Sequence, residues 1–150
     1  MRKNFINIFF ITLFIYAFGI NSSLLSQEEN NGNIFVVTTF EMAFKPGNTM
    51  AEFDSLNKLY TEKVISKNNL IVSQRTLRHF WGHNNRDFVV ITEVKNWGDI
   101  IEANKLSNEL FEKAWPTEEA RKEYNDANNK YFTGKHSDEI YQENAGGRVR

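Results

Sequence analysis

The pattern of apolar and polar residues predicts three strands in the first two thirds of the chain. The spans Ile34–Phe44, Leu70–Trp81 and Asp87–Val94 are rich in β-branched and aromatic residues, which favour strands. Residues 82–85 (Gly-His-Asn-Asn) suit a tight reversal, so the second and third spans predict a hairpin. Alternation in the third span gives one face of Phe88, Val90, Thr92 and Val94 and another of Val89, Ile91, Glu93 and Lys95. Because neither face is cleanly polar, we expect both faces of the sheet to be covered.

Apolar residues at intervals of three and four predict a helix after the first strand. Thr49 and Glu52 have the spacing of a capping box, in which a threonine oxygen and a glutamate carboxylate bind the first free amides of a helix. An apolar stripe follows them at Met50, Phe53, Leu56, Tyr60 and Val64. These features together predict a helix over residues 49–67.

The chain after the hairpin predicts two further helices and a short last strand. Asp99 is the predicted N-cap of a helix that ends at Trp115, because a proline follows. The next helix is predicted to open at Thr117 and to end near Gly134. Residues 136–141 then predict a strand, although His-Ser-Asp-Glu is a weak strand sequence.

This order of elements predicts an α+β domain: a ferredoxin-like βαββαβ fold with an antiparallel sheet and an extra helix before the last strand. Helices cover only one face of such a sheet. We expect the apolar residues of the other face, Phe35, Val37, Ile71, Leu77, Val89 and Ile91 or their alternates, to be covered by a second copy related by a two-fold axis. The predicted partner is therefore the chain itself.

The first residues predict a secretory signal peptide. Arg2 and Lys3 precede an apolar run over residues 5–20, and small polar residues follow, with cleavage expected just after Ser26. A single membrane anchor is the alternative, but the run is shorter than the ~20 residues that a spanning helix needs. The predicted organisation is a signal peptide (1–26), a flexible leader (27–33), the α+β domain (34–142) and a disordered tail (143–150). We expect no stable membrane insertion after cleavage.

Composition narrows the compartment and the chemistry. The 150 residues, 41% of them hydrophobic, allow one domain with its own core. The absence of cysteine excludes disulfides, thiolate metal sites and cysteine nucleophiles, and suits a bacterial periplasmic or secreted protein better than a small animal one. Removing Arg2 and Lys3 from the 18 basic residues leaves 16 against 19 acidic residues, a formal charge of −3. That charge does not favour a nucleic-acid partner.

Residues 34–141 resemble the dimeric α+β barrel superfamily of the antibiotic-biosynthesis-monooxygenase type, which includes haem-degrading relatives. The resemblance is carried by element order and by residues 88–102 (Phe-Val-Val-Ile-Thr-Glu-Val-Lys-Asn-Trp-Gly-Asp-Ile-Ile-Glu). It implies a pocket between sheet and helices in each protomer. The haem-degrading relatives bind haem through a histidine of the second helix, and this chain has none between Asp99 and Trp115. No cofactor is therefore expected.

The candidate ligand-binding residues are aromatic. We expect Trp81, Trp97, Phe40, Phe53 and Tyr60 to line a cavity for a small apolar or aromatic ligand. Core or interface packing of these rings is the alternative interpretation. The principal functional prediction is accordingly an exported homodimer that binds such a ligand and has no defined catalytic activity.

His136, His79 and Arg75 are the candidate catalytic residues. A histidine next to carboxylates, as in residues 136–139 (His-Ser-Asp-Glu), can act as a general base, and a guanidinium can hold a substrate carboxylate. The alternative function is thus a cofactor-independent, monooxygenase-like enzyme, and it requires these three side chains to meet at one pocket. A purely structural dimer is a third alternative.

A metal site is not expected. His79, His83 and Asp87 are each four residues apart, a spacing that holds a metal on a helix, but these residues flank a turn.

Overall fold

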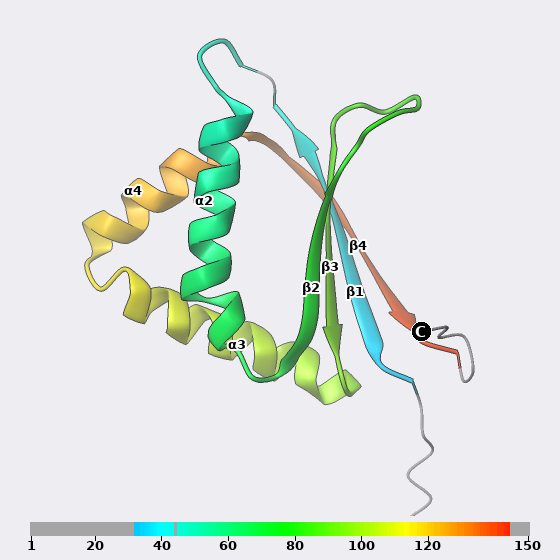
Figure 1. Ribbon diagram of the computed structural model, residues 1–150. Helices are drawn as coiled ribbons and strands as arrows, with labels where there is room; N and C mark the ends of the chain where they lie inside the picture. Colours follow the sequence, from blue (N-terminus) through cyan, green and yellow to red (C-terminus); the bar gives the residue numbers. More distant parts are fainter. Residues whose placement is uncertain (1–31, 44, 145–150) are drawn as a thin grey trace, which may run out of the picture. The chain divides into compact units, whose positions relative to one another are not determined.

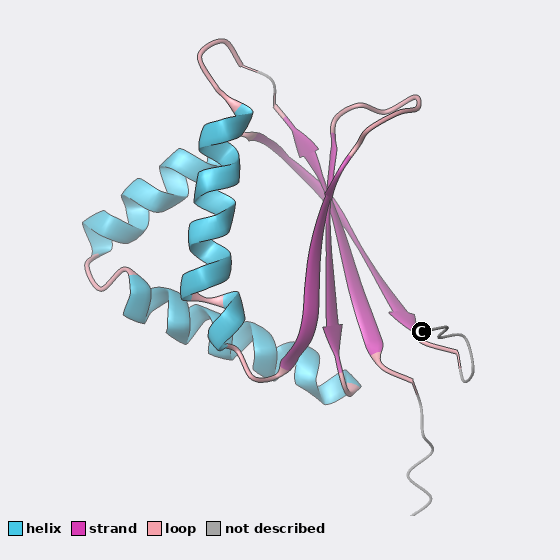
Figure 2. Cartoon of the chain, viewed as in Figure 1, coloured by secondary structure: helices cyan, strands magenta, loops and turns pink. Residues whose placement is uncertain are grey.

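The computed structural model describes residues 32–43 and 45–144. Their elements are β1 (Ile34–Met42), α2 (Met50–Lys63), the short 3₁₀ turn η1 (Ile65–Lys67), β2 (Ile71–Arg78), β3 (Asp87–Val94), α3 (Trp97–Ala114), α4 (Glu118–Asn129) and β4 (Phe132–Gln142) (Figures 1 and 2). The predicted element order, including the extra helix and the last strand, is confirmed. The predicted signal peptide, most of the leader and most of the tail lie outside the described residues.

The four strands form one antiparallel sheet in the order β2-β3-β1-β4. β1 is therefore a central strand, as its apolar character suggests. Phe40 lies between Phe88 on β3 and His136 on β4, and Thr38 lies between Val90 and Asp138. This register places the polar side chains of β4 beside the middle of β1.

The described helices all lie on one face of the sheet (Figure 1). The predicted alternation of β3 is confirmed, because Phe88 and Val94 are buried in the core beneath these helices. Phe35, Val37, Leu77, Val89 and Ile91 lie on the opposite, open face, where no described helix packs.

A β-bulge near the start of β2 changes which of its residues share a face. Ile71 lies opposite Val94, but Ser73 lies opposite Glu93, so one extra residue is inserted between them. Ile71 consequently faces the helices, whereas Arg75 and Leu77 face away. The predicted grouping of Ile71 with the open face is therefore wrong.

The N-terminal caps of the helices agree with the predicted caps only in part. Thr49 caps α2 by accepting a hydrogen bond from the Glu52 backbone amide at 3.2 Å, but the Glu52 carboxylate binds Lys130 and Tyr131 instead of completing a capping box. In α3 the N-cap is Asn96 rather than Asp99, which is three residues inside and completes a reciprocal capping box. The first helix is also shorter than the predicted span of residues 49–67, because the regular α-helix ends at Lys63.

Three small clusters of buried residues join the helices to the sheet and to each other. The first consists of Met42, Phe53, Phe88 and Tyr131, the second of Ile34, Val94 and Ala103, and the third of Val64, Trp115 and Tyr124. The first two clusters fasten the helices near opposite ends of the central strands. The third holds the three helices together, and a hollow is left over the middle of the sheet.

Candidate ligand-binding site

A cavity of about 920 Å³ lies between the helix-covered face of the sheet and α2, α3 and α4. Its size is within the usual range for small-molecule sites. Seven aromatic side chains are among those that line it: Phe40, Phe53, Tyr60, Phe88, Phe111, Tyr124 and Phe132. All seven belong to the buried clusters or pack directly against them, so these walls are formed by the core itself.

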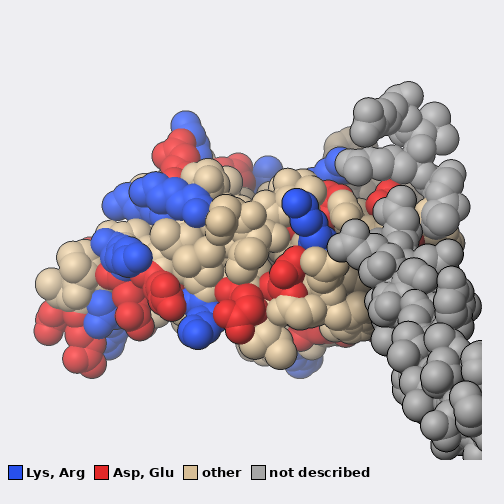
Figure 3. Space-filling view, turned by 90° about the horizontal axis from the view of Figure 1, so that it is seen from below, with Lys and Arg blue, Asp and Glu red and all other residues tan. Residues whose placement is uncertain are grey.

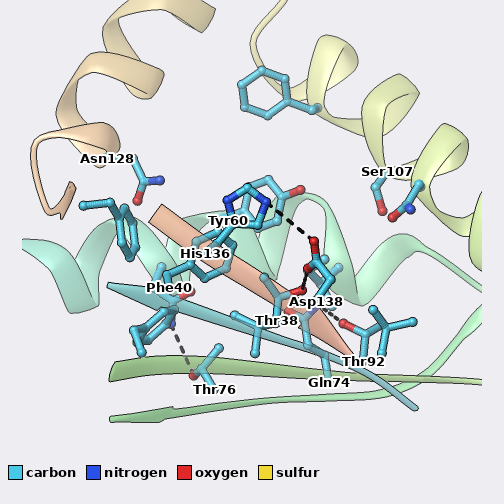
Figure 4. Close-up of a pocket in the computed structure, with 18 of the residues that line it drawn as sticks. Thr38, Phe40, Tyr60, Gln74, Thr76, Thr92, Ser107, Asn128, His136 and Asp138 are labelled. Carbon is cyan, nitrogen blue, oxygen red and sulfur yellow. Dashed lines mark hydrogen bonds and ion pairs between the residues drawn. The ribbon is translucent and has the colours of Figure 1, made fainter. Parts of the chain in front are cut away.

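A polar group on β1 and β4 forms one wall of the cavity (Figure 4). The Thr38 hydroxyl donates to Asp138 Oδ1 at 2.7 Å, and His136 Nε2 lies 3.5 Å from Asp138 Oδ2. The His136 ring lies next to Phe40, with 5.7 Å between ring centroids. About half of each of the His136 and Asp138 side chains is exposed, so both are accessible to a bound molecule.

Neutral hydrogen-bonding side chains complete the lining. On the sheet, Gln74 donates to Thr92 at 3.0 Å across β2 and β3. From the helices come Asn57 of α2, Asn104, Ser107 and Asn108 of α3, and Asn125, Asn128 and Asn129 of α4. Side-chain amides and hydroxyls both donate and accept hydrogen bonds, so they can bind a polar ligand without fixing its charge.

The cavity has few charges. Among the described residues no lysine or arginine lines it, and Asp138 is the one acidic residue of that lining. Burial raises the pKa of Tyr60, and burial together with the nearby Tyr60 raises that of Tyr124 to about 12, so both phenols are neutral at physiological pH. On the surface, by contrast, Figure 3 shows acidic and basic residues interspersed over the described part of one side.

Four of the predicted site residues line this cavity: Phe40, Phe53, Tyr60 and His136. Phe40 and His136 meet because the antiparallel register pairs them on β1 and β4, whereas Phe53 and Tyr60 come from α2, which covers this face of the sheet (Figure 1). Their roles in binding or catalysis stay predictions.

The other predicted site residues lie elsewhere. Arg75 is exposed on the open face of the sheet, and His79 follows the end of β2, where its Nε2 is buried without a hydrogen-bond partner in the described chain. Trp81 is 91% exposed in the β2–β3 loop, and Trp97 is 57% exposed at the start of α3. The structure therefore does not bring His136, His79 and Arg75 together, as the catalytic prediction required.

The helical asparagines and Thr38 were not among the predicted site residues. A signal for the asparagines exists, because asparagine is a poor helix former, yet it recurs in helical register at 104 and 108 and at 125, 128 and 129. Such spacing puts polar groups on one side of a helix. Thr38 has no comparable signal, since threonine is common in strands.

Within the described residues, no group of three or more histidine or acidic side chains could hold a metal ion. Near the hairpin, Asp87 instead accepts a hydrogen bond from the Asn84 amide at 2.6 Å. None of the described helices has both the length and the apolar character needed to cross a bilayer.

No protein-family model matches the chain, and no curated protein does so. Solved structures do match. A dimeric ferredoxin-like protein from an uncultured marine organism superimposes with a TM-score of 0.52 at 7% identity, over 83% of this chain and 97% of the other. The fold is ferredoxin-like. A nipsnap family protein of unknown function from Agrobacterium tumefaciens gives a TM-score of 0.50 at 9% identity, over 75% of this chain and 89% of the other.

Other matches are named for oxygenases. A cofactor-independent oxygenase from Streptomyces nogalater has a TM-score of 0.43 and 13% identity, over 76% of this chain and 93% of the other. Two further matches, at TM-scores of 0.47 and 0.49, are described as putative antibiotic biosynthesis monooxygenases from Caulobacter crescentus and Bordetella bronchiseptica. At these identities the matches establish the fold alone.

Proposed function

We propose that the protein binds a small, flat, largely apolar ligand in the cavity between sheet and helices. The observation that carries this proposal is the cavity of about 920 Å³ with seven aromatic side chains in its lining. Contact with rings gives a flat apolar ligand a large buried area, and a few polar groups fix its orientation.

A neutral fluorophore tests this proposal. N-phenylnaphthylamine brightens in apolar surroundings, and we expect saturable binding of one molecule per protomer to a chain that begins at Gln27. Thr76 lines the cavity from β2, so Thr76→Trp should fill part of it and weaken binding. Thr76→Val, which keeps the size of the side chain, is the matched control. Equal binding by both variants would show that the dye is bound outside the cavity.

We further propose that the protein is a homodimer whose protomers pack through the open faces of their sheets. Leu77, half exposed in the single chain, and its open-face neighbours Val37, Val89 and Ile91 provide an apolar surface, and a C₂ interface buries the same surface twice. Sedimentation velocity should give a dimer, and Leu77→Glu should shift it towards monomer. Ile101→Glu, at an α3 position that is 73% exposed, is the control that should leave the dimer intact. A wild-type monomer would refute this proposal.

Export to the periplasm or medium of a bacterium is the proposed location. Its support is the sequence pattern of residues 1–26, in which two basic residues precede an apolar run and small polar residues. Intact-mass analysis of the protein from a bacterial periplasmic extract should give a chain that begins at Gln27. A full-length mass in the membrane fraction would favour the anchor alternative.

A second candidate function is cofactor-independent oxygenation of the bound ligand. It is favoured by His136 and Asp138, which lie 3.5 Å apart on the cavity wall, because a histidine next to a carboxylate can take a proton from a phenolic ligand. Oxygen uptake in the presence of a dihydroxynaphthalene should then exceed the uncatalysed rate and be lost in His136→Gln. Rates equal to the uncatalysed one would leave ligand binding as the function.

A further inference from the structure

We propose that the ligand carries a positively charged nitrogen on an aromatic or apolar body, and that this nitrogen binds at Asp138. This inference rests on the proposed function, because it specifies the ligand of the same cavity. It depends on the charge distribution of the lining and on the geometry around one carboxylate.

The charge balance of the cavity disfavours an anionic ligand. In the part of the chain that the structure describes, Asp138 is the one acidic residue of the lining, and no lysine or arginine accompanies it. An anion would therefore meet a carboxylate and no guanidinium or ammonium, which costs free energy in a partly enclosed site. A cation would instead be attracted to the Asp138 carboxylate.

The carboxylate has room for a second partner. Asp138 Oδ1 accepts from the Thr38 hydroxyl at 2.7 Å, which fixes the side chain, whereas Oδ2 has His136 at the longer distance of 3.5 Å. More than half of the Asp138 side chain is exposed, and Figure 4 shows it pointing into the cavity. A protonated amine can approach Oδ2 and form a charge-assisted hydrogen bond there.

The surroundings of the carboxylate also suit a cation. Phe40 lies on the same face of β1, two residues from Thr38, and its ring packs on Phe132 with 5.3 Å between centroids. Cations are attracted to the faces of aromatic rings, most strongly where water is excluded. The amide oxygens of the helical asparagines can accept the remaining N–H groups of an ammonium.

Three naphthalene derivatives with the substituent at the same ring position separate the effect of ligand charge from that of the apolar ring. They are naphthylmethylamine, naphthylmethanol and naphthoate. We expect calorimetry at about pH 8, where imidazole side chains are mostly neutral, to rank the amine first and the carboxylate last. The amine should bind about 3–10-fold more tightly than the alcohol, since a half-exposed charged hydrogen bond is weaker than a buried one.

Two variants test whether the preference for the amine comes from Asp138. Asp138→Asn keeps the acceptor for Thr38 and should reduce the preference for the amine to within about twofold of the alcohol. Glu139→Gln removes the same charge one residue further on, where the side chain faces the opposite side of the sheet, and should keep the preference.

The outcomes distinguish the two proposals. Equal binding of all three compounds, tightest binding of naphthoate, or an unchanged amine preference in Asp138→Asn would overturn the inference while leaving the cavity as a ligand site. Binding of none of the three would overturn the proposed function and this inference with it.

Discussion

Phe53 contributes both to the stability of the fold and to the wall of the cavity. Its side chain is 2% exposed, and its ring centroid lies 5.0 Å from Phe88, 5.1 Å from Tyr131 and 5.6 Å from Phe132. It therefore fastens α2 to β3 and to the segment before β4, and it also forms part of the cavity wall.

The expected cost of Phe53→Ala follows from this packing. Exposing a buried phenylalanine loses roughly 1.5–3 kcal/mol of transfer free energy, and each lost aromatic pair adds about 0.5–1.5 kcal/mol. With the cavity left behind, we expect a loss of about 3–5 kcal/mol in the free energy of unfolding. Against a total of roughly 5–15 kcal/mol for a domain, this is a large fraction.

Urea denaturation followed by circular dichroism, at one fixed protomer concentration, measures this loss. Phe80→Ala is the control, because the Phe80 side chain is fully exposed in the β2–β3 loop and its loss should cost less than about 0.5 kcal/mol. A change below about 1 kcal/mol in Phe53→Ala would refute the reasoning, since it would mean that α2 is not fastened to the sheet by this ring.

Three further outcomes are expected. Lys130 and Tyr131 hold the pKa of Glu52 below its ordinary value of 4.5, so the carboxylate stabilises the fold above that pH and loses this contribution as the pH falls through its folded pKa. The difference in unfolding free energy between wild type and Glu52→Gln should therefore narrow below about pH 4.5. A difference that stays constant with pH would contradict this. Asn68, 3% exposed, makes three hydrogen bonds that join the start of β2 to α3, so Asn68→Ala should cost about 2–3 kcal/mol in urea denaturation. Gly134 has φ of +89°, so Gly134→Ala should lower stability by about 1–2 kcal/mol, and an unchanged melting temperature would exclude strain there.

The fold could be predicted from the sequence because local signals agreed with one another. The apolar alternation in β3 and the stripe in α2 each mark a face that must be buried, and the structure buries Phe88 and Phe53 against each other. β4 was harder to predict, because most of its side chains are exposed and a polar strand has no apolar alternation. It is a strand because its backbone pairs with β1 along nearly its whole length.

The site could be predicted only in part, for two physical reasons. The bulge after Ile71 shifts the register of β2, so simple alternation placed Ile71 on the wrong face of the sheet. His79 and Trp81 follow the end of β2, where the chain leaves the sheet and alternation no longer fixes a side. His136 was a candidate because an imidazole beside carboxylates is a chemical signal, and it does line the cavity. The pairing of Thr38 with Asp138, in contrast, spans 100 residues and needs the tertiary structure.

The separation of the buried clusters from the polar lining bears on how this protein can change over evolutionary time. Residues such as Gln74, Asn108 and Asn128 line the cavity without belonging to any of the three clusters. Under the proposed ligand binding, we expect substitution at these places to alter what the cavity recognises and to leave the packing of the three clusters in place. The proposal thus predicts that ligand preference can be changed by single substitutions, each of which leaves a protein that still folds.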